Sequence, residues 1–105
     1  MSSYNFYTYI LTNKSKRVLY TGITNNLERR LYEHYTGADQ PNSFTHKYQC
    51  YYLIWFERYQ HVQQAIDREK EIKGWLRKKK VGLIGETNPD WRFLNEDIVE
   101  WPPSK

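Results

Sequence analysis

Two short stretches near the start of the chain are rich in the β-branched and aromatic residues that favour strands. They cover residues 6–11 and 17–21, and the polar stretch Asn13-Lys14-Ser15-Lys16 lies between them. Two such stretches with a short polar connection are typical of a β-hairpin. We therefore expect the chain to begin with two antiparallel strands.

A helix is predicted directly after this hairpin. Residues 24–26 (Thr-Asn-Asn) supply side chains that cap helix N-termini, and Leu27 and Leu31 follow at the spacing of one helix face. Gly37 is a typical residue just past the end of a helix. The polar residues 38–49 predict a loop, and its length of about twelve residues suggests a functional role.

The strongest strand signal is the apolar run at residues 50–57, which predicts a central strand buried on both faces. Apolar residues at helical spacing then predict one helix over residues 62–73 and another over residues 75–84, with Gly74 as the break between them. The remaining residues predict turns and one helical turn.

This order of elements, ββαβαα, predicts a small α+β fold with a three-stranded antiparallel sheet flanked by helices. A length of 105 residues indicates a single domain over residues 1–105. We expect its core at about residues 6–91, followed by an acidic tail, 92–105, that contains Trp and Pro. The tryptophans Trp91 and Trp101 either cover the core or bind a protein, and packing on the core is the favoured interpretation.

Composition narrows the class of protein. Aromatic residues make up 17% of the chain, which excludes a disordered protein. The single cysteine, Cys50, excludes an internal disulfide framework and a Cys-based zinc site, and it suits a reducing compartment. The start of the chain has no signal-peptide pattern, and no apolar run is long enough to span a bilayer. We expect a cytoplasmic protein without membrane contact.

Charge is unevenly distributed along the chain. Residues 1–85 contain 14 Lys and Arg against 7 Asp and Glu, whereas residues 86–105 contain 2 against 5. A polyanion would be drawn to the first part, although an ordinary soluble surface with an acidic end fits equally well. Candidate contacts with a nucleic-acid backbone are Lys47 in the polar loop and the run Arg77, Lys78, Lys79 and Lys80.

Two polar residues of the first predicted helix, Arg30 and His34, share a face with its two leucines. They therefore lie at the margin of a core-facing stripe. A guanidinium held there suits bidentate binding of a phosphate. The alternative is that the stem of Arg30 packs on the sheet while its head pairs with Glu28 or Glu33, as surface ion pairs commonly do.

Glu69 is a carboxylate on the apolar face of its predicted helix, with apolar residues three and four positions away. A buried carboxylate needs an ion pair, hydrogen bonds or a cation. The alternatives are a structural ion pair with Lys73 or Arg30, and a magnesium ligand that leaves most of the waters on the ion.

The tyrosines of the hairpin are ordinary strand residues taken singly, and packing is the default interpretation for each. Tyr7-Thr8-Tyr9 and Tyr20-Thr21-Gly22 nevertheless form two related motifs, in which residues 10 to 19 separate Tyr9 from Tyr20. Gly22 permits a close approach of another group, or simply ends a strand.

With Arg30 and His34 following, these motifs resemble the GIY-YIG nuclease family, especially its small stand-alone bacterial members, over about residues 6–91. The sequence departs from the family name where Tyr7 and Thr8 replace glycine and isoleucine, and where Thr21 replaces isoleucine. These are structural positions, so the tyrosine chemistry is retained.

The resemblance implies a divalent-metal-dependent endonuclease that cuts DNA, including structured or single-stranded DNA, in repair or recombination. It implies a single Mg²⁺ or Mn²⁺ bound by Glu69, and in-line attack of water activated by one of the two tyrosines. Other members attach a separate DNA-binding domain, so a protein partner that supplies target specificity is expected. The implied catalytic residues are Tyr9, Tyr20, Arg30, His34 and Glu69, and Gly22 and Asn88 are implied at the nucleic-acid site.

A second hypothesis is a non-catalytic module that binds nucleic acid on a nuclease fold. In that case residues 77–80 would bind backbone phosphates and exposed aromatic rings would stack on bases.

Overall fold

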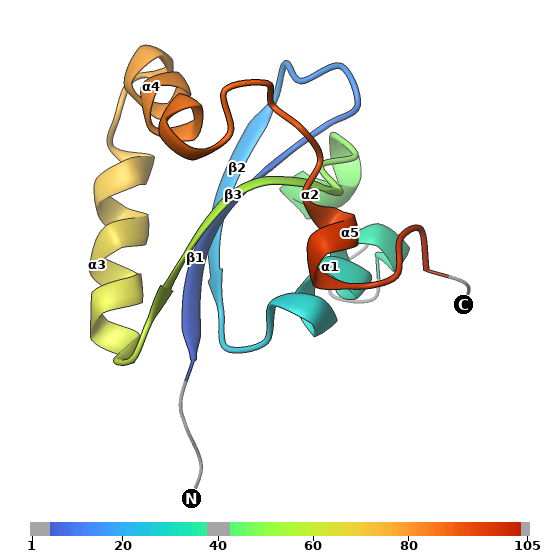
Figure 1. Ribbon diagram of the computed structural model, residues 1–105, viewed down its shortest axis with the longest axis horizontal. Coiled ribbons are helices and arrows are strands. Elements are labelled where there is room, and N and C mark those ends of the chain that lie inside the picture. The colour runs from blue at the N-terminus through green and yellow to red at the C-terminus, as the bar shows by residue number, and fades with distance from the viewer. Residues whose placement is uncertain (1–4, 38–42, 104–105) are drawn as a thin grey trace, which may run out of the picture.

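A computed structural model of the protein describes residues 5–37 and 43–103 (Figure 1). Three antiparallel strands form its sheet in the order β2-β1-β3, so the central strand is the first in the sequence. The strands are β1 (Phe6–Thr12), β2 (Leu19–Thr24) and β3 (Tyr52–Tyr59).

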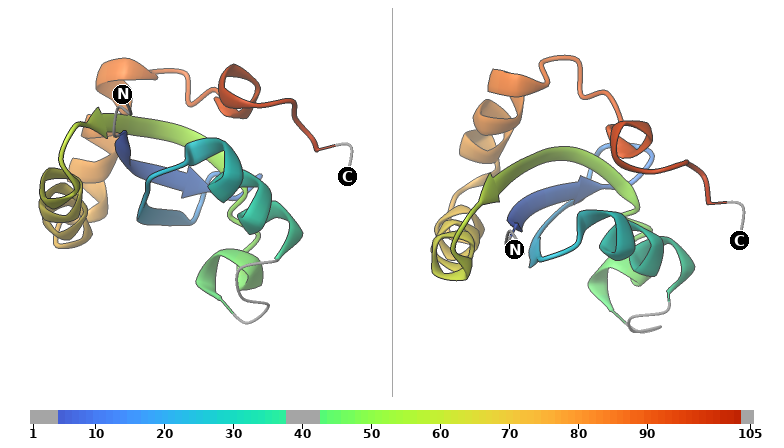
Figure 2. Two further views of the ribbon diagram at one scale, coloured as in Figure 1. Left: turned by 90° about the horizontal axis from the view of Figure 1, so that it is seen from below. Right: turned by 60° about the horizontal axis from the view of Figure 1, so that its bottom comes forward.

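Helices cover both faces of this sheet, which confirms the predicted α+β fold. The order ββαβαα is present, with two short helices in addition (Figures 1 and 2). The helices are α1 (Leu27–Thr36), α2 (Phe44–Lys47), α3 (Val62–Lys73), α4 (Arg77–Thr87) and α5 (Asn95–Ile98).

Alternation along β1 divides the core into two clusters, because successive side chains point to opposite faces of a sheet. Tyr9 and Leu11 pack against the buried leucines of α1. Ile10 packs on the other side with Ile72 of α3 and Ile84 of α4. The face that carries Tyr9 is therefore covered by α1, and the opposite face by α3 and α4 (Figure 2).

The prediction that the third strand is central was wrong, because β3 lies at an edge of the sheet. Residues 53–55 are nevertheless buried. The chain near α5 runs beside them: the Leu94 backbone N–H donates to the Leu53 carbonyl (2.7 Å), and the Leu53 N–H donates to Asn95 Oδ1 (2.8 Å). The C-terminal segment thus takes the place of a neighbouring strand, which explains the misleading apolar run.

Several predicted boundaries also differ. The second strand runs to Thr24, so Gly22 lies inside it. Residues 43–49 of the predicted loop contain α2, while residues 38–42 lie outside the described part of the chain. The last long helix begins at Arg77, two residues later than expected, and continues to Thr87.

The tail and the cysteine have structural roles. Trp101 packs against the cluster around Leu31, and Trp91 packs against the cluster around Ile84, as the packing interpretation expected.

Burial raises the pKa of the Cys50 thiol to about 11, so little of it is the reactive thiolate at neutral pH. Within the described ranges, no helix has the length and hydrophobicity needed to cross a bilayer.

Candidate active site

A hydrogen-bonded cluster connects the central strand to α1. Tyr9 Oη lies 2.9 Å from His34 Nε2, and Arg30 Nε donates to the same phenol oxygen at 3.4 Å. Tyr9 and His34 are both 1% exposed, so the cluster is fixed by its surroundings. Three of the five predicted catalytic residues are thus brought together from two elements.

The local sequence sets the position of α1. Asn26 caps the helix by accepting from the Arg29 backbone N–H (3.0 Å), and Gly37 ends it in the left-handed conformation at φ 75°. Leu27 and Leu31 are buried and fix the rotation of the helix about its axis. The inward face is therefore the one that also carries the arginine and histidine of the cluster.

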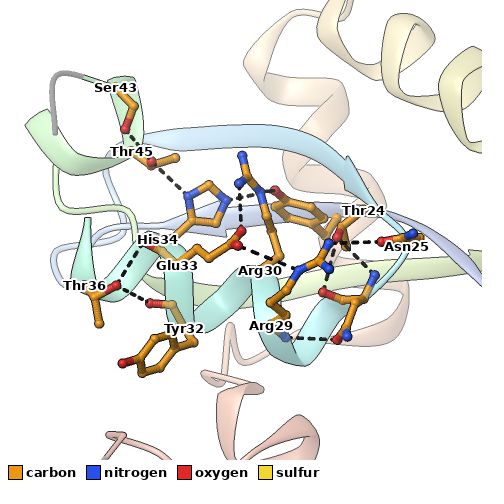
Figure 3. Close-up of polar contacts among 12 residues, drawn as sticks. Thr24, Asn25, Arg29, Arg30, Tyr32, Glu33, His34, Thr36, Ser43 and Thr45 are labelled. Atoms are coloured by element: carbon orange, nitrogen blue, oxygen red, sulfur yellow. Dashed lines mark hydrogen bonds and ion pairs between the residues drawn. The ribbon is translucent and has the colours of Figure 1, made fainter. Parts of the chain in front are cut away.

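Both ring nitrogens of His34 are hydrogen-bonded within the cluster. Its Nε2 contacts the Tyr9 phenol oxygen, which also accepts from Arg30 Nε. Its Nδ1 lies 3.0 Å from Thr45 Oγ1, and Ser43 Oγ is 3.0 Å from the same Thr45 oxygen. Figure 3 shows His34 pointing toward Thr45 and Ser43. The imidazole is held between two hydroxyl groups.

Arg30 also forms the ion pair that the alternative interpretation expected. Its Nη1 donates to Glu33 Oε1 at 3.1 Å, one helical turn away (Figure 3). The Arg30 side chain is 28% exposed. It therefore contacts the buried phenol and Glu33, while part of the side chain reaches the surface, where a phosphate is accessible.

Tyr20 and Gly22 lie beside this cluster on β2. The Tyr20 ring is half-buried, stacks on Phe44 of α2 and lies edge-on to His34 with ring centroids 5.7 Å apart. A Cβ atom at Gly22 would lie 2.6 Å from Tyr9 Oη and 3.0 Å from Tyr20 Cε2. Glycine is needed here because the Tyr9 phenol occupies the space of a side chain. The predicted contact of Gly22 with nucleic acid stays a prediction.

We expect Gly22→Ala to displace the Tyr9 phenol and to lower the free energy of unfolding by about 1–3 kcal/mol, as overpacking does. Urea unfolding measures this change. Gly82→Ala is the matched control, since no atom lies within 4 Å of its added Cβ and alanine favours the helix. Equal stability of the Gly22 variant and the wild type would contradict this packing role.

Glu69 belongs to the other side of the sheet. It lies one turn after Ala65 of α3, whose carbonyl accepts from Thr8 Oγ1 (2.9 Å) on the face away from Tyr9. The carboxylate pairs with Lys73 Nζ at 3.1 Å, as one alternative expected. The Glu69 side chain is 18% exposed, against 52% for Lys73. Glu69 is therefore outside the hydrogen-bonded cluster, on a helix that also contacts edge strand β2.

The donor set around Glu69 suits a weakly coordinated hard cation. In residues 5–37 and 43–103, no three His, Cys, Asp or Glu side chains are placed to bind a metal together. Mg²⁺ commonly keeps several waters and takes one or two carboxylates together with substrate phosphates. Glu69 is a single, partly exposed carboxylate that is paired with the exposed Lys73. It suits a largely hydrated ion and does not suit a site in which protein side chains supply every ligand.

The predicted basic contacts are divided between the two sides of the sheet. Lys47 lies on α2, above the Tyr48 ring. The run at the start of α4 lies on the opposite side of the sheet, where Arg77 donates to the carbonyls of Arg17 (2.8 Å) and Lys16 (3.1 Å). Lys79 lies over the Trp75 ring at 4.5 Å, while Lys78 is exposed and Lys80 half-buried. A nucleic-acid contact by these residues stays a prediction.

Asn88 has a structural place in the fold. It follows α4, is 6% exposed and donates to the carbonyls of Ile54 (3.0 Å) and Arg92 (2.8 Å). Its Oδ1 accepts from the Arg92 N–H at 2.9 Å. These bonds attach the end of α4 to β3, and the expected place of Asn88 at the nucleic-acid site stays a prediction.

Sequence reasoning missed the residues of α2 that support the cluster. Thr45 orients His34, Ser43 contacts Thr45, and Phe44 stacks on Tyr20. Their segment has no strong periodicity, and its contacts with α1 and β2 come from tertiary packing alone. The one available signal was Ser43, a favoured residue at a helix N-cap.

The sequence of this fold matches the catalytic domain of a nuclease family. The profile of the GIY-YIG catalytic domain matches residues 5–81, so the chain belongs to the GIY-YIG family and the resemblance of its tyrosine motifs is confirmed.

Similar proteins carry the name UPF0213. One from Clostridium perfringens is 38% identical over 74% of this chain and 81% of its own length. Another, from Natronomonas pharaonis, is 36% identical over 76% of this chain and 91% of its own length. The solution NMR structure of a UPF0213 protein from Bacillus halodurans has a TM-score of 0.54 and 28% identity, covering 83% of this chain and 89% of that one. The three-stranded fold is thus shared with a solved structure.

Proposed function

We propose that this protein is a divalent-metal-dependent endonuclease that hydrolyses phosphodiester bonds in DNA. The observation that carries the proposal is the convergence of Tyr9, Arg30 and His34 in one hydrogen-bonded cluster beside Tyr20. All four residues lie within the part of the chain that matches the catalytic domain of the family.

The two tyrosines have different surroundings, which supports different roles. Tyr9 is buried and hydrogen-bonded, so we assign it to positioning Arg30 and His34. Tyr20 is half-buried, and we assign its phenol to the attacking water. The water oxygen attacks phosphorus in line, the bond to the leaving oxygen breaks, the Tyr20 side chain takes the proton of the water as a phenolate, and the leaving oxygen takes a proton from solvent. A free phenol is almost entirely protonated at neutral pH, so a divalent cation held by Glu69 would have to assist.

Arg30 stabilises the charge that develops in this step, and His34 positions the tyrosines beside it. The accessible part of the Arg30 guanidinium donates to the phosphoryl oxygens, whose negative charge grows in the transition state. His34 lies edge-on to the Tyr20 ring and is hydrogen-bonded to Tyr9, so it holds both rings in place. The hydroxyl of Thr45 fixes the orientation of the imidazole.

Glu69 is the residue that would hold the metal ion. When bound, Mg²⁺ or Mn²⁺ supplies charge stabilisation at the leaving oxygen and lowers the pKa of water. The exposed Lys73 is the group that Glu69 would exchange for the cation, and an exposed i, i+4 ion pair contributes only about 0.3–0.5 kcal/mol. We also propose that Lys78 and the other basic residues of α4 contact the DNA backbone away from the cut, and that a protein partner supplies target specificity.

Cleavage assays with several nucleic acids test this proposal. Supercoiled plasmid and labelled single-stranded, flap, duplex and RNA oligonucleotides are incubated with Mg²⁺, Mn²⁺ or EDTA. We expect internal nicking of DNA that requires the metal. Salt-sensitive binding without cleavage under any metal would contradict the enzyme and favour the non-catalytic binding module.

A further inference from the structure

A pocket of about 370 Å³ opens at the start of α1, on the sheet face that carries Tyr9. This volume lies at the small end of the range for pockets that bind small molecules. Two aromatic rings, three amides and one carboxylate contribute to its lining: Tyr7, Phe56, Asn5, Asn25, Asn26 and Glu28.

The pocket adjoins the proposed active site. Tyr7 is two residues from Tyr9 on β1, so the two side chains share a face. Phe56 of β3 is directly opposite Tyr9 in the strand register, where facing side chains are about 5 Å apart at Cβ. A molecule in this pocket therefore lies one side chain away from the Tyr9 cluster.

Aromatic rings give the pocket surfaces suited to stacking. Tyr7 and Phe56 meet edge-to-face with ring centroids 6.2 Å apart, an arrangement that leaves ring faces available to a ligand. Phe56 is 36% exposed although it lies in the middle of a strand. Stacking of a base on such rings tolerates any base, because every base has a π face.

The interior of the pocket and its rim differ in charge. Among the described residues that line the pocket, Glu28 alone is charged, so the interior does not suit a phosphate. Two guanidiniums attach to the lining amides from outside: Arg29 Nη2 donates to Asn25 Oδ1 (3.2 Å), and Arg58 Nη1 donates to Asn5 Oδ1 (2.7 Å). Figure 3 shows Arg29 and Asn25 at the same end of α1 as Arg30.

We propose that this pocket binds one unpaired nucleobase of the DNA strand, adjacent to the phosphate that is cut. The base stacks on Tyr7 and Phe56, the amide nitrogens donate to its acceptors, and Arg29 and Arg58 bind the flanking phosphates. A base inside a duplex cannot enter a recess of this size without leaving its stack. The inference rests on the proposed function and adds a preference for single-stranded or flap DNA.

Binding measured in EDTA tests the pocket without cleavage. A labelled single-stranded oligonucleotide is compared with copies that have one abasic nucleotide at successive positions. We expect one position at which base removal weakens binding about 5- to 100-fold, the range for loss of one stacked base. Phe56→Ala should weaken binding of the intact strand by a similar factor and should bind intact and abasic strands equally, since both changes remove the same contact.

Val81→Ala is the matched control, because it truncates an exposed apolar residue on α4, across the sheet from the pocket. It should retain the wild-type preference for the intact strand. If Phe56→Ala does not fold, Asn25→Ala and the abasic series on the wild type decide the result. Equal binding of all abasic strands by the wild type would overturn the pocket, even if DNA is cut. A base preference without cleavage under any metal would instead overturn the proposed enzyme and leave the pocket standing.

Discussion

Replacing Glu69 by glutamine should reduce metal-dependent nicking by about 10²–10³-fold or more, since it removes the charge of the proposed metal ligand and keeps its shape. The free energy of unfolding should fall by no more than about 0.5 kcal/mol, because the residue loses only its i, i+4 pair with the exposed Lys73. Initial nicking rates across a Mg²⁺ titration, together with urea unfolding, measure both effects.

Glu71→Gln provides the control on the same helix. Glu71 is more exposed and pairs with Arg68 at 2.9 Å, so this variant loses the same charge from a solvent-facing position and should cut at the wild-type rate. Direct Mn²⁺ binding, followed by the paramagnetic signal of the free ion, adds a readout besides activity. Wild-type nicking by Glu69→Gln would remove Glu69 from the site.

Replacing Arg30 by alanine should lower the rate constant of cleavage by about 10²–10³-fold, the usual effect of losing a donor that stabilises transition-state charge. Two contributions act in the same direction. The phosphoryl oxygens lose the guanidinium, and the Tyr9 phenol, which also contacts His34, loses a hydrogen-bond donor. Single-turnover cleavage of a labelled flap, with protein in excess, measures the chemical step.

Conservative and distant variants distinguish this role from a general loss of positive charge. Arg30→Lys keeps the charge but lacks the planar group, so it should recover only a small part of the rate. Arg92→Ala removes an exposed arginine that pairs with Asp97 outside the matched domain, and it should cut normally. Equal losses in Arg30→Ala and Arg92→Ala would show that net charge alone is responsible.

Local patterns predicted the helices well where periodicity and end signals agreed. The helix at Val62–Lys73 has the predicted bounds because its apolar spacing and Gly74 indicate the same end. The strand order was not available from such patterns. The apolar run at residues 53–55 correctly indicates that these residues are buried. It does not tell whether the backbone of β3 pairs with a further strand or, as the structure shows, with the side chain of Asn95.

The site was predictable to a similar degree. The helical spacing of Arg30 and His34 placed them together, and the motif spacing aligned Tyr9 with Tyr20. Nothing local to Gly22 indicated that the phenol of Tyr9 fills the space above it, since that contact crosses two strands. The distance between Glu69 and the phenols likewise depends on which face α3 covers, and that is decided by the packing of its whole apolar side.

The edge strand β3 is protected against pairing with a strand of another chain. Along β3, Asn95 accepts from the Leu53 N–H and donates to the Tyr51 carbonyl at 2.8 Å, and so imitates the peptide group of a further strand. This side-chain amide blocks the pairing of β3 with a strand of another polypeptide. A protein shortened before α5 would lose these hydrogen bonds, and we would then expect copies to polymerise through β3 at concentrations where the intact chain does not.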